Sequence, residues 1–115
     1  MGKNQEYLSD EGYALMGAAF EVFKEQGSGL SEDIYQESVE VELGFRNISF
    51  SSKQELDVFY KDVLLKKKYV PDLLVYSEIV TELKAVKDLD SAHEQQLLNY
   101  MHITKKAVGD LINFA

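Results

Sequence analysis

The sequence predicts an α/β (α+β) fold in which a mixed β-sheet is flanked by helices. Apolar residues recur at helical spacing in the first part of the chain, and the pattern changes to a period of two in the middle. A second helical stretch follows residue 90, before a final apolar stretch. With 115 residues, 45% of them hydrophobic, the chain fits one domain over residues 1–115. The expected order is two helices, four strands, a helix and a strand.

Two helices are predicted first. Ser9 or Asp10 can cap the first helix, and Gly27 begins the Gly-Ser-Gly stretch that ends it, because glycine accepts the left-handed conformation of a helix stop. Ser31 can cap the second helix, and Gly44 is its expected end. The expected helical spans are 8–26 and 31–44.

The period of two begins after the second helix. Lys61-Asp62 is the expected hairpin turn inside one strand region, although no glycine supports it. Ser77-Glu78 is short enough to form a tight hairpin between two apolar strands. The expected strand regions are 45–56, 56–65, 70–76 and 79–85.

A third helix and a last strand complete the predicted fold. The residues from Asp88 to Ser91 introduce the helix, which runs to about Ile103. Its buried face is expected to carry Leu97, Leu98 and Met101. The last strand is expected over 107–114.

Composition narrows the class of protein. The chain has no cysteine, which excludes disulfides, thiolate metal ligands and cysteine nucleophiles. It shows neither a secretory signal nor a run long enough to cross a membrane, so we expect a cytoplasmic protein. The formal net charge of −8 opposes tight nucleic-acid binding, although Lys66-Lys67-Lys68 and Lys105-Lys106 are local basic groups.

One constellation of charged residues indicates chemistry. Asp72 follows Pro71 in one apolar strand, and Glu82 and Lys84 lie in the next strand, two positions apart and therefore on one face. Antiparallel neighbours can place Asp72 beside Glu82. Two carboxylates suit Mg²⁺ or Mn²⁺, and a nearby lysine can position an attacking water or neutralise developing charge. The alternative is structural: Lys84 is simply the ion-pair partner of Glu82 or Asp72.

The same residues belong to a longer resemblance. The chain resembles the GxxExxY family, a small branch of the PD-(D/E)XK nuclease-like superfamily. The naming signature is the run from Gly29 to Tyr35, with Glu32 at its centre. The resemblance continues, in order and at fitting spacings, through 72–75, 80–86, 93–100 and 108–114.

The resemblance implies a restriction-endonuclease-like core and a set of site residues. Asp72 and Glu82 would be metal ligands, and Lys84 the catalytic lysine. Glu32 would complete the metal site, with Glu37 as the other candidate. In the helix after the sheet, the polar position of the active site would be Gln96.

Several residues also have simpler explanations. Glu32 can serve the helix dipole alone, and Gln96 can cap the end of the sheet. Tyr35 is expected to be a core or rim aromatic, and His93 to be structural or exposed. The lysines at 66–68 matter for function only if they lie beside the acidic cluster.

Three functions remain open at this point. The first is a Mg²⁺-dependent nuclease or phosphodiesterase that acts on nucleic acid, with DNA favoured over RNA. The second is a non-catalytic interaction protein on the same fold, and the third an enzyme acting on a small phosphorylated substrate. Apolar edge strands or helix faces could support a homodimer, a hypothesis that a strictly monomeric mass would refute.

Overall fold

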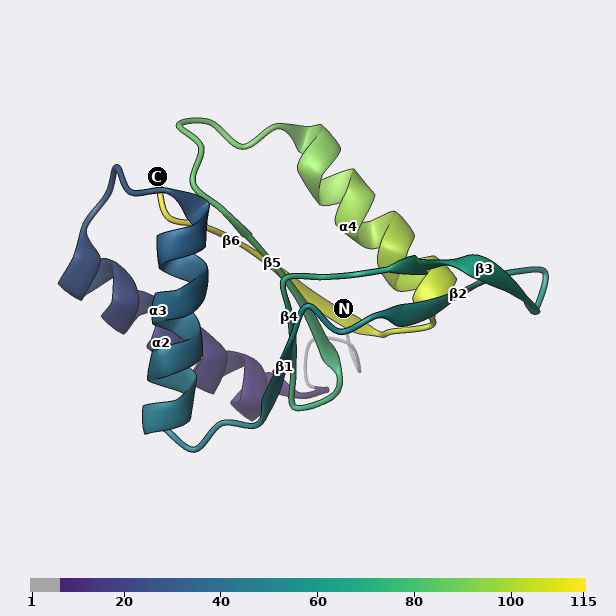
Figure 1. Cartoon of the computed structure of the whole chain (residues 1–115), viewed down its shortest axis with the longest axis horizontal. Helices are drawn as coiled ribbons and strands as arrows, with labels where there is room; N and C mark the ends of the chain where they lie inside the picture. The colour runs from purple at the N-terminus through teal and green to yellow at the C-terminus, as the bar shows by residue number, and fades with distance from the viewer. Residues whose placement is uncertain (1–6) are drawn as a thin grey trace.

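A computed structural model describes residues 7–115 and shows a mixed α+β fold consistent with the restriction-endonuclease-like core (Figure 1). Within these residues, two helices are followed by five strands, a third helix and a sixth strand. The helices are α2 (Ser9–Gln26), α3 (Glu32–Phe45) and α4 (Ser91–Thr104). The strands are β1 (Phe50–Ser52), β2 (Leu56–Tyr60), β3 (Val63–Tyr69), β4 (Leu73–Val75), β5 (Ile79–Lys84) and β6 (Val108–Asn113).

The strands form two sheets instead of the single mixed sheet that was expected. Four strands pair in the order β1-β4-β5-β6, antiparallel except for the parallel pair β5 and β6. Strands β2 and β3 pair only with each other and project from the body as a hairpin (Figure 1). Five strands, one more than predicted, precede α4, because the turn at Lys61-Asp62 divides the expected strand region 56–65 into β2 and β3. β1 lies inside the expected region 45–56 but is only three residues long.

Each face of the four-stranded sheet is covered by a separate core. Leu73, Ile79 and Leu83 on one face pack with α2 and α3. Leu74 and Val80 on the other face pack with α4 and the hairpin. Successive residues of a strand alternate between these two cores, as the pleat requires. The side chain of Glu82 therefore lies on the α4 and hairpin side, opposite to that of Leu83.

The helix ends differ from the predicted caps at several points. Ser31 is the N-cap residue of α3, as predicted, but its side chain makes no capping bond. The N-cap residue of α2 is Leu8, which has a left-handed backbone, and Ser9 is the first residue of the helix. Asp10 lies inside the helix, where its charge complements the dipole. Gly27 ends α2 as predicted, with φ of 74° and its N–H bonded to Phe23 O. The prediction of Gly44 as the second stop was wrong: α3 continues to Phe45.

The predicted hairpin turn and the last helix are both present. Lys61 and Asp62 have φ of 48° and 65°, the left-handed pair that matches the twist of a two-residue hairpin. Asp90 caps α4 by accepting from Ala92 N at 2.9 Å, and His93 Nδ1 accepts from Asp90 N at 3.2 Å. His93 therefore has the structural role that was expected.

The buried face of α4 is narrower than predicted. Leu97 is buried and Met101 is half-buried, but Leu98 is 50% exposed. The reason is geometric, since Leu98 lies about 100° around the helix from Leu97 and points away from the sheet. Within residues 7–115, no helix has the length and apolar composition needed to cross a bilayer.

Candidate functional site

Asp72 and Glu82 lie directly opposite each other on neighbouring strands. Leu73 of β4 pairs with Thr81 of β5, and the next pair in this antiparallel register is Asp72 with Glu82. The backbone N–H of Asp72 donates to Glu82 Oε1 at 3.3 Å. The same register logic places Lys53, which follows β1, beside Asp72, and its N–H donates to Asp72 O at 3.2 Å. Lys53, Asp72 and Glu82 thus form one row across three strands.

All four oxygens of this carboxylate pair accept a hydrogen bond from the protein. Asp72 Oδ2 accepts from the backbone N–H of Leu83 at 2.7 Å, and Asp72 Oδ1 accepts from Lys53 Nζ at 2.6 Å. Glu82 Oε1 accepts from the Asp72 N–H, and Glu82 Oε2 accepts from the Tyr69 hydroxyl. Two of these donors are backbone groups, so the orientation of the pair is fixed by the sheet itself.

The ionisation of Asp72 is favoured by its donors. Burial on its own would raise the pKa of Asp72, but the Leu83 N–H and the Lys53 ammonium hold that pKa below the ordinary value of 3.8. The same contact raises the pKa of Lys53, because the hydrogen bond to Asp72 stabilises the ammonium. Asp72 and Lys53 therefore form a charged pair at neutral pH.

The ionisation of Glu82 is opposed by its surroundings. Burial raises the pKa of Glu82 above its ordinary value of 4.5, and the negative charge of Asp72 raises it further against the lowering effect of the Tyr69 hydrogen bond. Burial and the bond to Glu82 together raise the pKa of Tyr69 far above its usual range. Tyr69 therefore keeps its proton and acts as the donor in this contact.

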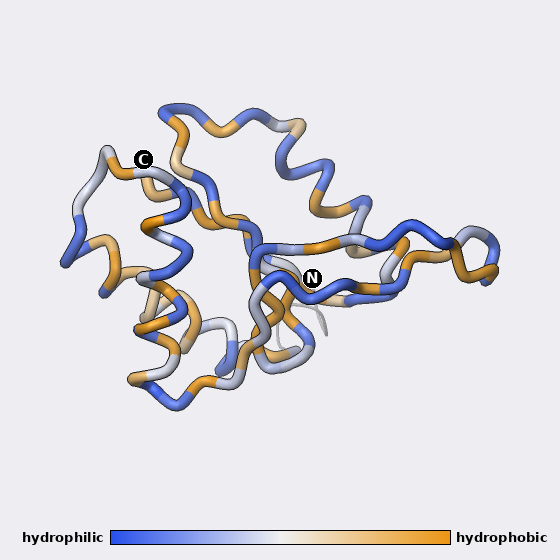
Figure 2. The backbone as a smooth tube through the Cα atoms, viewed as in Figure 1, coloured by the Kyte–Doolittle hydropathy of each residue, from blue (hydrophilic) through white to orange (hydrophobic). Residues whose placement is uncertain are grey.

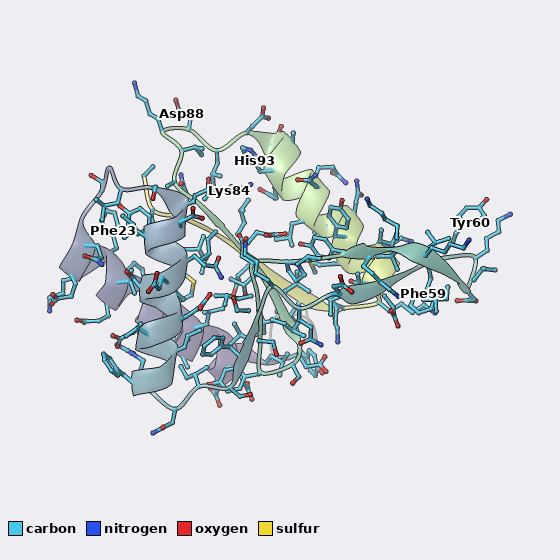
Figure 3. All side chains as sticks on the ribbon, in the orientation of Figure 1. Phe23, Phe59, Tyr60, Lys84, Asp88 and His93 are labelled. Carbon is cyan, nitrogen blue, oxygen red and sulfur yellow. The ribbon has the colours of Figure 1, made fainter. Side chains whose placement is uncertain are left out.

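Lys84 lies on the same face of β5 as Glu82 but is not part of the ion pair. It is half-buried, and in the view of Figure 3 it lies between α3 and the start of α4, where His93 is labelled. None of the ion pairs within residues 7–115 includes Lys84. The cation that contacts Asp72 is Lys53, a residue that the sequence did not single out. Its only signal would have been the register of β1, which is too short to read.

Helix α3 contributes polar contacts to the edge of this site. Gln36 Nε2 donates to Asp72 O at 2.9 Å and to Glu40 Oε2 at 2.7 Å. Glu32 lies one helical turn before Gln36, on the same side of α3, and is exposed without a hydrogen bond to the carboxylate pair. Glu37 instead lines a groove between α2 and α3, together with Glu21 and Glu25 of α2. Of the two candidate glutamates, Glu32 is on the side of the site.

Gln96 stands on the side of α4 that faces the hairpin. It precedes Tyr100 by one turn, and the Tyr100 ring stacks on the Tyr69 ring with centroids 3.9 Å apart. Gln96 itself is exposed and makes no hydrogen bond to the carboxylates within the described residues. Gln96 therefore has no direct contact with Asp72 or Glu82. It is one helical turn from Tyr100, which stacks on Tyr69, and Tyr69 donates to Glu82.

Tyr35 is a core residue, as was expected. Its side chain is fully buried, its hydroxyl donates to Gly27 O, and its ring stacks on Phe114 with centroids 4.6 Å apart. Gly29 has φ of 92°, a conformation that L side chains rarely adopt. The first and last residues of the signature run thus fix the turn between α2 and α3.

The chemistry of the carboxylate pair suits a hard divalent cation. Among residues 7–115, no group of three or more His, Cys, Asp or Glu side chains is placed to hold a metal ion, so a cage made only of protein ligands is absent there. Mg²⁺ does not need one, since it is usually held by one or two carboxylates and fills its other positions with water and phosphate oxygens. The Lys53 ammonium on Asp72 is direct evidence that this oxygen attracts a cation.

A sequence-family model described as the PD-(D/E)XK nuclease superfamily matches residues 9–115. The chain belongs to the PD-(D/E)XK nuclease superfamily. Pro71-Asp72 and Glu82-Leu83-Lys84 are the segments expected from the sequence to match the letters of that name, and the register of β4 with β5 places Asp72 opposite Glu82. Comparisons with the curated proteins and with the solved structures gave no match.

Proposed function

We propose that this chain is a nuclease or phosphodiesterase that depends on Mg²⁺ or Mn²⁺ and hydrolyses phosphodiester bonds of nucleic acid. The observation that carries the proposal is the pairing of Asp72 with Glu82 on adjacent strands, with Lys84 two residues further along the same face. Asp72 and Glu82 would hold the ion together with water and phosphate oxygens, and Glu32 of α3, which does not contact the pair in this structure, is the proposed further ligand. When bound, the ion would supply Lewis-acid stabilisation of the charge that develops on the phosphate.

The protein residues have separable roles in this proposal. The backbone N–H groups of Leu83 and Asp72 orient the two carboxylates. Lys84 follows Glu82 by two residues on the same face of β5, and its ammonium would position the attacking water or neutralise developing charge. Gln96 would contact the substrate from α4. The assignment to the GxxExxY branch, with Glu32 as its signature residue, stays a prediction.

The distribution of charge supports a nucleic-acid substrate in spite of the acidic total. Residues 1–50 carry ten Asp and Glu against three Lys and Arg, whereas residues 51–115 carry ten against nine. Half of the chain is thus almost neutral, and it contains the site and the hairpin. Figure 2 shows a continuous hydrophilic stretch on β3 of that hairpin. A local surface of this kind can approach phosphates that the rest of the molecule repels.

The hairpin is built to expose its lysines. Its register shifts so that Val58 of β2 faces three residues of β3, and this bulge contains the exposed Lys66 and Lys67. Further along β3, Tyr69 donates a hydrogen bond to Glu82. Lys67 precedes Tyr69 by two residues, so the exposed lysines lie on the strand that reaches the site. Tyr60, 63% exposed near the tip (Figure 3), offers a ring on which a base can stack. These features favour nucleic acid as the partner, and the preference for DNA over RNA stays a prediction.

A metal titration followed by NMR is the first experiment. We expect Mg²⁺ or Mn²⁺ at millimolar concentration to perturb signals centred on Asp72 and Glu82, and to lose that effect in Glu82→Gln. The matched control is Glu25→Gln, an exposed glutamate in α2, which should leave the titration unchanged. Perturbations that persist in Glu82→Gln would place the metal elsewhere and contradict the proposal.

Cleavage is tested with the same variants. In the presence of Mg²⁺, Glu82→Gln and Lys84→Ala should each lower the rate of DNA or RNA hydrolysis by at least about 100-fold, because each removes a group that acts on the reacting phosphate. Lys24→Ala, which removes an exposed lysine of α2, controls for the loss of one positive charge. Equal rates in Lys84→Ala and Lys24→Ala would contradict the role of Lys84.

One observation favours a second function, a non-catalytic interaction protein. All four oxygens of the carboxylate pair already have protein donors, so the pair is stable without an ion. In that case neither metal nor the Glu82→Gln substitution would change partner binding, and no metal-dependent signal would shift. The homodimer and the cytoplasmic location stay predictions, and a molar mass measured in concentrated solution tests the first of them.

A further inference from the structure

We infer that Lys53 is an internal counter-cation of the carboxylate pair, which a divalent metal must displace from Asp72 before it can bind. The inference rests on the proposed metal site and adds a residue that controls its affinity. The Lys53 ammonium contacts Asp72 Oδ1 at 2.6 Å, and Asp72 Oδ2 accepts from the Leu83 N–H, so an ion held by Asp72 Oδ1 would have to share that oxygen with Lys53. Lys53 and a divalent metal are therefore alternatives for one oxygen.

The backbone of Lys53 holds its side chain in this position. The Lys53 N–H donates to Asp72 O at 3.2 Å, which continues the pairing of β1 with β4 by one residue. Lys53 also has φ of 54°, a left-handed conformation that residues other than glycine seldom adopt. The conformation lies at the end of β1, beside the site. When a residue beside a candidate site has a strained backbone, the strain is a reason to look for a function of that residue.

Among the groups that donate hydrogen bonds to the carboxylate pair, only the Lys53 ammonium can move away without disturbing the sheet. The Leu83 and Asp72 N–H groups belong to the backbone of β5 and of the segment before β4, and the Tyr69 hydroxyl is on a buried side chain stacked between the hairpin and α4. The Lys53 side chain is 57% exposed, so its ammonium can move into water at little cost. Displacement of Lys53 would free Asp72 Oδ1 while the other three contacts remain.

The charges around Lys53 explain why it stays in place when no ion is bound. Asp72, Glu82 and Asp33 all attract the ammonium. A divalent cation experiences the same attraction with twice the charge, so it competes for the same position. If a divalent ion and the ammonium compete, removal of the ammonium strengthens metal binding. If Lys53 instead supported the site, its removal would weaken metal binding.

The test compares metal affinity in four forms of the full chain: wild type, Lys53→Met, Lys53→Arg and Lys68→Met. Mg²⁺ and Mn²⁺ are titrated separately, with calorimetry and the NMR signals of Asp72 and Glu82 as readouts. We expect Lys53→Met to bind metal about tenfold more tightly than wild type, because a charged hydrogen bond no longer has to be broken. Lys53→Arg, which keeps a cation, should stay close to wild type.

Lys68→Met is the matched control. Lys68 also pairs with an aspartate, Asp57, on the hairpin, and it forms no ion pair with Asp72 or Glu82. It should leave the affinity unchanged if the effect of Lys53→Met comes from the contact with Asp72. Thermal melting of each variant verifies that it is folded, which the exposure of Lys53 leads us to expect. A further readout is the Lys53 side-chain NMR signal, which should move during the titration of the wild type.

The outcomes separate this inference from the proposed function. Tighter binding in Lys53→Met, or binding in that variant alone, supports the inference. Metal bound at Asp72 and Glu82 with equal or lower affinity in Lys53→Met overturns it and leaves the proposed metal site intact. Absence of binding in every form, Lys53→Met included, overturns the proposed metal site and the inference with it.

Discussion

Asp72 and Glu82 face each other across neighbouring strands, and the N–H of Asp72 donates to Glu82 Oε1 at 3.3 Å. Although the two acids are adjacent, their pKa values move in opposite directions: that of Asp72 is lowered and that of Glu82 is raised. Asp72 accepts hydrogen bonds from the backbone N–H of Leu83 and from the Lys53 ammonium, which stabilise its charged form. Burial and the charge of Asp72 disfavour the charged form of Glu82. The two residues should therefore affect stability with opposite signs.

The first prediction concerns the pH dependence of folding. Folding raises the pKa of Glu82. The contribution of Glu82 to the free energy of unfolding is therefore fully present below about its ordinary pKa of 4.5, and it is lost as pH rises through the higher folded pKa. Glu82→Gln should therefore be more stable than wild type at neutral pH, by about 1 kcal/mol, and the difference should shrink in acid. Thermal melts between pH 3 and 8 measure this.

The matched variant Asp72→Asn should give the reverse. Folding lowers the pKa of Asp72. The contribution of Asp72 to the free energy of unfolding is therefore present above its ordinary pKa of 3.8, and it is lost as pH falls through the lower folded pKa. The variant should be less stable than wild type at neutral pH and approach it in acid. A gain in stability for both variants at pH 7 would contradict the opposite pKa shifts.

The second prediction concerns the hydroxyl of Tyr69. Tyr69→Phe keeps the ring that stacks on Tyr100 but removes the hydrogen bond to Glu82. The pKa of Glu82 should rise further, since this bond lowers it, and unfolding should become easier by about 1–3 kcal/mol. Titration of the Glu82 carboxyl by NMR and denaturant melts provide the measurements. Tyr100→Phe, which leaves the bond to Glu82 intact, should shift the pKa of Glu82 little.

The third prediction concerns the packing of α4 on the sheet. A Cβ at Gly109 would come within 2.6 Å of Met101 Sδ and 3.3 Å of Val80 O, so Gly109→Ala should destabilise the fold by about 1–3 kcal/mol. Gly44 in α3 has no atom within 4 Å of such a Cβ, and Gly44→Ala should stabilise the fold by about 0.5–1 kcal/mol through helix propensity. Urea unfolding of the two variants should show shifts of opposite sign.

The fourth prediction concerns the turn between α2 and α3. Tyr35→Phe keeps the stack on Phe114 but leaves the Gly27 carbonyl without its donor. It should lower the free energy of unfolding by about 1–2 kcal/mol, because a half-buried acceptor loses its partner. Tyr13→Phe, at a tyrosine that is 83% exposed, removes a hydroxyl that already faces water and should change stability little. Comparable losses in both variants would mean that the Gly27 contact does not stabilise the turn.

The sequence alone determined most of the secondary elements and the residues proposed for the site. The helices, the hairpin turn at Lys61-Asp62 and the strands around Asp72 and Glu82 were readable because periodicity, capping residues and glycine act within a few positions. The two-residue spacing of Glu82 and Lys84 fixes one face of a strand whatever surrounds it. The superfamily was likewise recognisable from residues in their order along the chain.

Tertiary structure decided which groups meet. β1 occupies only three residues of the expected strand region 45–56, and only its pairing with β4 brings Lys53 to Asp72. Tertiary structure also forms the hydrogen bonds from Gln36 to Asp72 and from Tyr69 to Glu82, which join residues far apart in the chain. Local pattern specifies the face on which a side chain lies, but its partner depends on strand register and on the docking of helices, which the whole core determines.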